Sequence, residues 1–156
     1  MDEFVPLNMD GLNKFASSNN GSLWPALLEK ASAKVYGGYW NIVGGSVEQA
    51  FKDLTAAPCE TFYRKDSSAI QIINRLIDAQ NKKFLVVVST EKEEKNLEKN
   101  CGLVPEHAYL VCGIFKISNE VVFKLRNPHG KVEKWNGEWS EGSKKWNESS
   151  RSQANF

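Results

Sequence analysis

Two neighbouring apolar segments constrain the fold of this chain more than any other feature. Residues 107–117 and 121–126 are mostly apolar runs of strand length, joined by a short polar connection at Ser118 and Asn119. Such a connection joins antiparallel neighbours in a hairpin. The sequence therefore predicts a strand pair that brings position 107 within a few residues of position 127. Facing side chains in such a pair lie about 5 Å apart.

The two ends of this predicted hairpin carry polar residues with complementary chemistry. His107 opens the first strand and Asn127 closes the second. The Asn carbonyl can accept a hydrogen bond from one imidazole nitrogen, which leaves the other nitrogen free to take a proton from a thiol. The alternative is two polar strand ends that are satisfied by solvent. Spacing alone favours that alternative, because His and Asn are common at strand ends.

The N-terminal third is predicted to be a polar lead-in followed by a helix. We expect residues 1–21 to be extended, and Ser22 to cap a helix that Gly37-Gly38 ends. Pro25 suits the first turn of that helix. Apolar residues recur on more than one of its sides, which predicts a central helix with Leu27 in its core.

The remaining elements give the fold class. Ser46 and Gln49 form a possible capping box for a short helix ending near Leu54, and Ser67 or Ser68 begins a third helix. Residues 84–88 are predicted to form a buried strand, residues 91–99 a charged loop or short helix, and the tail from residue 137 a polar segment with isolated tryptophans. Helices precede strands in blocks, so the expected class is α+β with an antiparallel sheet.

Seven segments, taken in order, resemble the protease core of the calpain family of cysteine proteases. They are spread across most of residues 20–147, and the ordered set is far more specific than any one segment. They are residues 27–34 (LLEKASAK), 36–39 (YGGY), 44–45 (GG), 50–55 (AFKDLT), 102–109 (GLVPEHAY), 125–130 (LRNPHG) and 135–141 (WNGEWSE).

The resemblance implies roles for His107 and Asn127 and a domain organisation. His107 matches the family's general base and Asn127 its orienting residue. Calpains divide the active site between two lobes, and residues 22–156 resemble a papain-like second lobe that is clipped at its C-terminal end. In the family the nucleophilic cysteine lies on the first lobe, in a Gly-Asp-Cys-Trp context that follows a Gln of the oxyanion hole. No such segment occurs in this sequence.

The three cysteines do not replace the missing motif. Cys59 follows a predicted helix, Cys101 ends the charged segment, and Cys112 lies inside a predicted strand as a small core residue. None has a preceding Gln or a helix N-terminus to activate its thiol. Their odd number and lack of metal-ligand spacing indicate free thiols in a reducing compartment, so we expect a cytoplasmic protein.

Two departures from the family pattern concern ligands and shielding. The family usually has Trp directly after the Asn-Pro pair, where it shelters the His–Asn hydrogen bond; this sequence has His129. The family also binds calcium on the second lobe, and Glu133 and Glu141 lie near those acidic positions. Calcium takes six to eight oxygens, so we expect an incomplete site and no other cofactor. Surface carboxylates are the simpler interpretation, and a His107–His129 metal pair lacks a third ligand.

Composition limits the classes of partner. The net charge is +1, which gives no reason to expect nucleic acid, and no apolar run approaches the length of a membrane span. Two functions remain. The chain is expected to supply the His and Asn half of a calcium-dependent cysteine endopeptidase whose Cys half lies on another polypeptide or another part of the same one. Alternatively, it is a pseudoenzyme lobe that acts as a scaffold within an assembly. In either case the chain alone is expected to be inactive.

Overall fold

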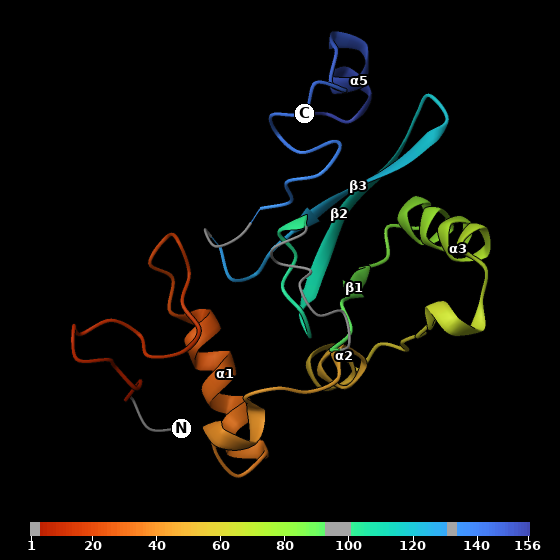
Figure 1. The fold of residues 1–156 in the computed structure, drawn as a ribbon. Helices are drawn as coiled ribbons and strands as arrows, with labels where there is room; N and C mark the ends of the chain where they lie inside the picture. Colours follow the sequence, from red (N-terminus) through yellow and green to blue (C-terminus); the bar gives the residue numbers. More distant parts are fainter. Residues whose placement is uncertain (1–3, 93–100, 131–133) are drawn as a thin grey trace. The chain divides into compact units, whose positions relative to one another are not determined.

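The computed structural model describes residues 4–92, 101–130 and 134–156, and it divides into two compact units. Unit 1 is Met1–Cys59 and unit 2 is Glu60–Phe156. The described residues hold α-helices and a three-stranded antiparallel sheet of order β1-β2-β3 (Figure 1), which confirms the α+β class. The predicted division into a lead-in of residues 1–21 and a lobe of residues 22–156 stays a prediction.

Unit 1 contains α1 (Trp24–Val35), the 3-10 helix η1 (Tyr39–Ile42) and α2 (Val47–Thr55). The predicted cap at Ser46 is confirmed, since its side chain accepts a hydrogen bond from the Gln49 amide. The predicted capping box is incomplete, because the Gln49 side chain bonds to Asp53 instead. The predicted cap at Ser22 is wrong by one residue. The N-cap of α1 is Leu23, which has no side-chain acceptor, and Pro25 in the first turn removes one amide that would need a partner.

The buried face of α1 is not the face that the sequence predicts. Ala26, Lys30 and Ala33 follow helical spacing and are buried, and the Lys30 ammonium donates to the Phe4 carbonyl. Leu27 lies on the other face and is 39% exposed, so its predicted place in the core is wrong. Residues on more than one helix side are apolar, but unit 1 covers only one of those sides.

Unit 2 begins with the 3-10 helix η2 (Arg64–Asp66) and α3 (Ala69–Asn81), whose capping box joins Ser68 and Gln71. At the other end Lys83 adopts a positive φ of 59°, and the Phe84 amide donates to the Ala79 carbonyl. This closing turn is a Schellman motif. It occupies the beginning of the predicted strand, so β1 is only Val87–Ser89 and the Phe84 side chain is exposed.

The hairpin of β2 (Ala108–Ile117) and β3 (Glu120–Arg126) confirms the predicted strand pair to within one residue at each boundary. Because β1 is short, part of β2 has no strand on that side among the described residues. The Gln80 side chain of α3 fills this gap: its amide oxygen accepts from Ile114 N at 2.6 Å and its amide nitrogen donates to Ile114 O at 3.1 Å. Ile114 and Ile117 are among the buried residues of this unit.

A cluster of aromatic and charged residues ties the C-terminal segment, which includes α5 (Glu148–Gln153), to the sheet. The Trp139 and Trp146 rings meet edge to face at 4.8 Å, and Trp146 stacks on Phe156 at 4.7 Å. Trp139 donates to the Glu120 carboxylate at the start of β3, which also binds Lys145 at 2.6 Å. The tryptophans are therefore packed against neighbours rather than isolated.

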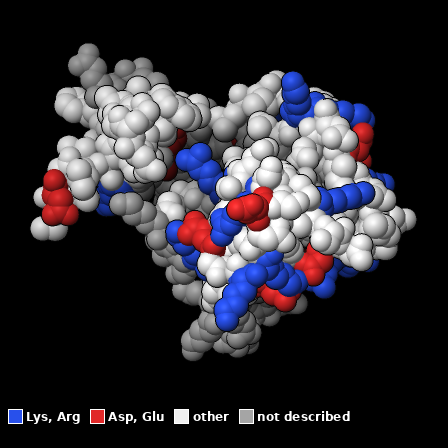
Figure 2. Space-filling view, turned by 90° about the horizontal axis from the view of Figure 1, so that it is seen from above, with Lys and Arg blue, Asp and Glu red and all other residues white. Residues whose placement is uncertain are grey.

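The face of the molecule in Figure 2 shows no dominant sign of charge. Figure 2 shows Lys and Arg interspersed with Asp and Glu on the visible face, as the net charge of +1 suggests. Over the part of the chain that the structure describes, no helix is long and apolar enough to cross a membrane. Most of the charged segment 91–99 lies outside the described residues.

Glu120 gives a test of the C-terminal packing. Hydrogen bonds from Lys145 and Trp139 lower the pKa of its carboxyl. Because the pKa of the Glu120 carboxyl is lower in the folded than in the unfolded state, its ionised form stabilises the fold at neutral pH. This stabilisation is lost as the pH falls below the usual pKa range of glutamate and then through the pKa of the folded state. Glu120→Gln should therefore lower the urea midpoint at pH 7, and the difference from wild type should vanish in acid. Glu60→Gln, which removes an exposed carboxylate 3.9 Å from Arg75, is the control and should change little.

Candidate functional site

The structure brings the two predicted site residues together within unit 2. His107 Nε2 lies 2.9 Å from Asn127 Oδ1, a hydrogen bond between residues that are 20 positions apart. His107 directly precedes β2 and Asn127 directly follows β3. Both side chains are half-buried. The contact that the hairpin predicts is therefore present. Its chemical role depends on which nitrogen of the His107 ring carries the proton.

A second hydrogen bond fixes which ring nitrogen carries the proton. The His129 amide donates to Asn127 Oδ1 at 2.9 Å. A main-chain N–H can only donate, so this Asn127 atom must be the oxygen, and it can only accept. His107 Nε2 therefore donates, and in the neutral ring Nδ1 holds the lone pair. No hydrogen bond among the described residues involves Nδ1, so it is able to accept a proton from another group.

A β-bulge places Asn127 on the same face of the sheet as His107. Near the turn, Ile117 pairs with Glu120 and Ile114 with Phe123, but after the register shift between Val111 and Gly113, Leu110 pairs with Arg126. Position 127 then continues the ladder opposite Tyr109, on the His107 face. Without the extra residue it would lie opposite Leu110, on the other face, because side chains alternate along a strand.

The bulge also explains a wrong prediction. Cys112 is the residue that the ladder leaves unpaired, and it is exposed rather than a small core residue. Cys59 and Cys101 are half-buried, and no disulfide joins any of the three cysteines. None occupies a nucleophile motif.

Two aromatic rings pack against the His107 ring. Tyr109, which is 4% exposed, meets it edge to face at 4.9 Å, and His129 lies against it at 4.1 Å with a tilt of 39°. His129 therefore takes up the covering position that the family gives to Trp, although its side chain is exposed. Tyr109 was not assigned a role from sequence; its place two residues after His107 on a strand, on the same face, was the available signal.

Asn127 carries an unsatisfied group. Its amide nitrogen Nδ2 is buried and has no hydrogen-bond partner among the described residues. A buried donor without a partner costs about 1–3 kcal/mol. The Asn127 side chain is thus not arranged for maximal stability, a feature that is typical of functional positions.

The predicted calcium ligands do not form a site among the described residues. Glu133 lies outside the described residues, and Glu141 Oε2 is paired with Lys134 Nζ at 2.9 Å on the surface. The described part of the chain holds no group of three or more His, Cys, Asp or Glu that could bind a metal ion. One ion-paired carboxylate does not fit the six to eight oxygens that calcium requires.

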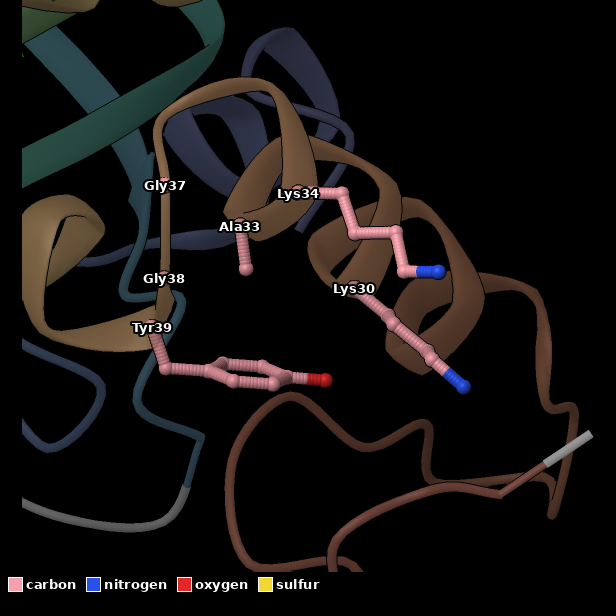
Figure 3. A pocket seen from close by; sticks show the side chains of 6 residues that line it. All are labelled: Lys30, Ala33, Lys34, Gly37, Gly38 and Tyr39. Carbon is pink, nitrogen blue, oxygen red and sulfur yellow. The ribbon is translucent and has the colours of Figure 1, made fainter. Parts of the chain in front are cut away.

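Unit 1 contains a small open pocket of about 280 Å³, which is lined by residues of the segments 27–34 and 36–39. Figure 3 shows the Lys30 and Lys34 side chains from α1 and the Tyr39 ring from η1 around it. Phe15 stacks on Tyr39 with ring centroids 4.5 Å apart. The Lys30 ammonium already donates to a main-chain carbonyl, so we assign no ligand to this pocket.

Comparisons with known proteins identify the family. A model of the calpain family cysteine proteases matches residues 1–155. Human calpain-14 is 40% identical over 151 residues, which cover 94% of this chain and 22% of calpain-14. Calpain-5 of Caenorhabditis elegans is 36% identical over 182 residues (98% of this chain, 28% of the relative), and the maize calpain-type cysteine protease DEK1 is 28% identical over 155 residues (95% and 7%). The chain belongs to the calpain family, and it spans about a quarter or less of these relatives.

Asn127 and Gln80 form a matched pair for a stability test. Gln80→Ala removes two hydrogen bonds to Ile114 without removing an unsatisfied group, and we expect it to cost about 1–3 kcal/mol. Asn127→Ala also removes two accepted bonds but eliminates the orphaned donor, so we expect a change of less than about 1 kcal/mol. Urea unfolding of both variants measures this. Equal losses would show that Asn127 is there for stability.

Proposed function

We propose that this chain supplies the general base and the orienting residue of a calpain-type cysteine endopeptidase. The observation that supports this most is the hydrogen bond of 2.9 Å between His107 Nε2 and Asn127 Oδ1, which leaves Nδ1 as the proton acceptor. The chemical steps follow from that orientation. Family membership makes a cysteine protease site the natural context for this pair.

In the proposed reaction, Nδ1 of His107 takes the proton of a cysteine thiol, and the thiolate attacks the carbonyl carbon of a peptide bond. The imidazolium then gives its proton to the leaving amine, and water hydrolyses the resulting thioester with His107 again acting as base. Asn127 Oδ1 accepts from Nε2 throughout. It keeps the ring in one orientation and favours its charged form, as the acidic member of a catalytic triad does.

The cysteine is proposed to come from a first lobe, on the same or another polypeptide. The sequence has no Gly-Asp-Cys-Trp segment, and no Gln lies within six residues before any of its cysteines. The exposed face of α1 supports the need for a further protein surface. Trp24 is 65% exposed and Leu28 41% exposed, and with Leu27 and Ala31 they line an apolar hollow of about 340 Å³. Contiguous apolar surface of this kind marks interaction sites.

The second candidate is a scaffold without catalysis. The missing nucleophile motif favours it. The apolar face of α1 is compatible with it, because such a face can bind a partner in an assembly as well as the first lobe of an enzyme. The two candidates differ in one respect: a catalytic half must accept a first lobe so that His107 faces the thiol. We place the chain in the first class because Nδ1 is left without a partner among the described residues. A cytoplasmic location and exposed, flexible peptide substrates are proposed with it. We propose no calcium-dependent step for this chain.

The isolated chain should not cleave casein, with or without added calcium, because removal of the nucleophile from such a triad costs about a millionfold in turnover. Addition of a Cys-bearing calpain first lobe should give cleavage that His107→Ala abolishes. Trp24→Ser should weaken this complementation without unfolding the chain. Two results oppose the proposal. Cleavage by the chain alone that disappears on substitution of Cys59, Cys101 or Cys112 would mean that it carries its own nucleophile. Tight binding of the first lobe without cleavage would favour the scaffold.

The complemented enzyme also tests the covering ring. His129→Trp keeps the main-chain donor to Asn127 and places a larger apolar ring beside the His–Asn bond, which excludes water. Its turnover should be unchanged or higher than that of wild type. His129→Ala keeps the same donor but removes the ring, and it should lower turnover. If His129→Trp folds normally yet loses most of its activity, the imidazole has a role of its own.

A further inference from the structure

The turn that leads into His107 has an unusual conformation for its sequence. Glu106 adopts a positive φ of 50°, a region that residues other than glycine rarely enter. Pro105 precedes it, so residues 104–107 have the proline and the positive φ of a type II turn, but with Glu where glycine is favoured. Left-handed backbone costs such a residue about 1–2 kcal/mol. The surrounding structure must therefore hold the turn in place.

The Thr90 hydroxyl occupies the position that closes this turn. Oγ1 lies 2.6 Å from the Val104 carbonyl oxygen and 3.0 Å from the His107 amide nitrogen. The His107 carbonyl, 3.2 Å from Oγ1, already accepts the Thr90 amide at 3.0 Å. The single hydroxyl proton thus goes to Val104 O, and Oγ1 accepts from His107 N–H. The hydroxyl bridges the two groups that a closed turn would bond directly.

A second residue braces the same turn from the strand. The Tyr109 hydroxyl accepts from the Val104 amide at 2.8 Å, while its ring meets the His107 ring edge to face. Thr90 and Tyr109 therefore hold both ends of residues 104–107. Among the described residues, Thr90 alone bonds to the main chain of His107 itself: the Thr90 amide donates to the His107 carbonyl, and the His107 amide donates to Thr90 Oγ1.

We propose that Thr90 is a positioning residue, whose hydroxyl sets the main-chain direction at His107 and thereby the aim of its imidazole at Asn127. Only the consequence for catalysis rests on the proposed function. The orientation of the His107 ring is a property of this chain alone. The sequence carried no signal for it, because Thr90 lies 17 positions from His107 and beyond the end of β1.

The test is the tautomer of His107 in the intact chain, read from long-range ¹H–¹⁵N spectra of histidine-labelled protein at a pH where the ring is neutral. Wild type should show one tautomer, protonated at Nε2. Thr90→Val, which has nearly the same shape but no hydroxyl, should lose the single-tautomer signature, and Thr90→Ser should restore it. Thr55→Val is the matched control, since Thr55 Oγ1 donates to a helix carbonyl in unit 1 and its loss should not alter His107.

The outcomes separate this inference from the proposed function. A wild-type ring with mixed tautomers contradicts the His107–Asn127 pair itself. A single tautomer that persists in Thr90→Val overturns the role of Thr90 and leaves the pair intact. If Thr90→Val does not fold, amide exchange in wild type decides: a His107 amide as protected as those of β2 supports the bridge, and one that exchanges as fast as Glu106 overturns it. In the complemented enzyme, Thr90→Val should lower kcat on the order of tenfold with KM little changed, because the loss is one of orientation.

Discussion

The register of the β2–β3 ladder is the constraint on which the rest of the site depends. Side chains on a strand alternate between faces, so a shift by one residue moves a side chain to the other side of the sheet. The bulge at Cys112 makes that shift between the turn and the site. It brings Asn127 to the face that carries Tyr109 and His107, and the hydrogen bonds of Asn127 Oδ1 then select one tautomer of His107.

Several side-chain contacts hold the β2–β3 hairpin in the conformation that this register requires. β1 is too short to pair with all of β2, and the Gln80 side chain completes the main-chain bonding at Ile114. Thr90, just beyond β1, closes the turn before His107. Trp139 and Lys145 hold the far end of the hairpin at Glu120. Each contact joins segments that are distant in the sequence, and together they restrict the backbone that carries the pair.

The sequence was sufficient where structure follows from local pattern. Caps at Ser46 and Ser68 and the strand limits of the hairpin were predicted because side-chain capping and strand period act over a few residues. The His107–Asn127 contact was predicted because a short turn joins its two strands. The bulge was not, since nothing in the local pattern at Cys112 distinguishes a bulged residue from a paired one. Thr90 was missed because its partners are 14 and 17 positions away.

Unit 1 shows the opposite limit. Apolar residues on several sides of α1 predict that the helix is buried. The sequence does not show which protein surface covers each side, and Leu27 is partly exposed in this chain. For the site to work as proposed, this chain must assemble the His–Asn pair before any first lobe is present. A crystal structure of the isolated chain measures this most directly. It should show His107 Nε2 within hydrogen-bond distance of Asn127 Oδ1 and a bulge at Cys112. A regular ladder with Asn127 on the face of Leu110, or a His107 ring that turns its other nitrogen to Asn127, would contradict it.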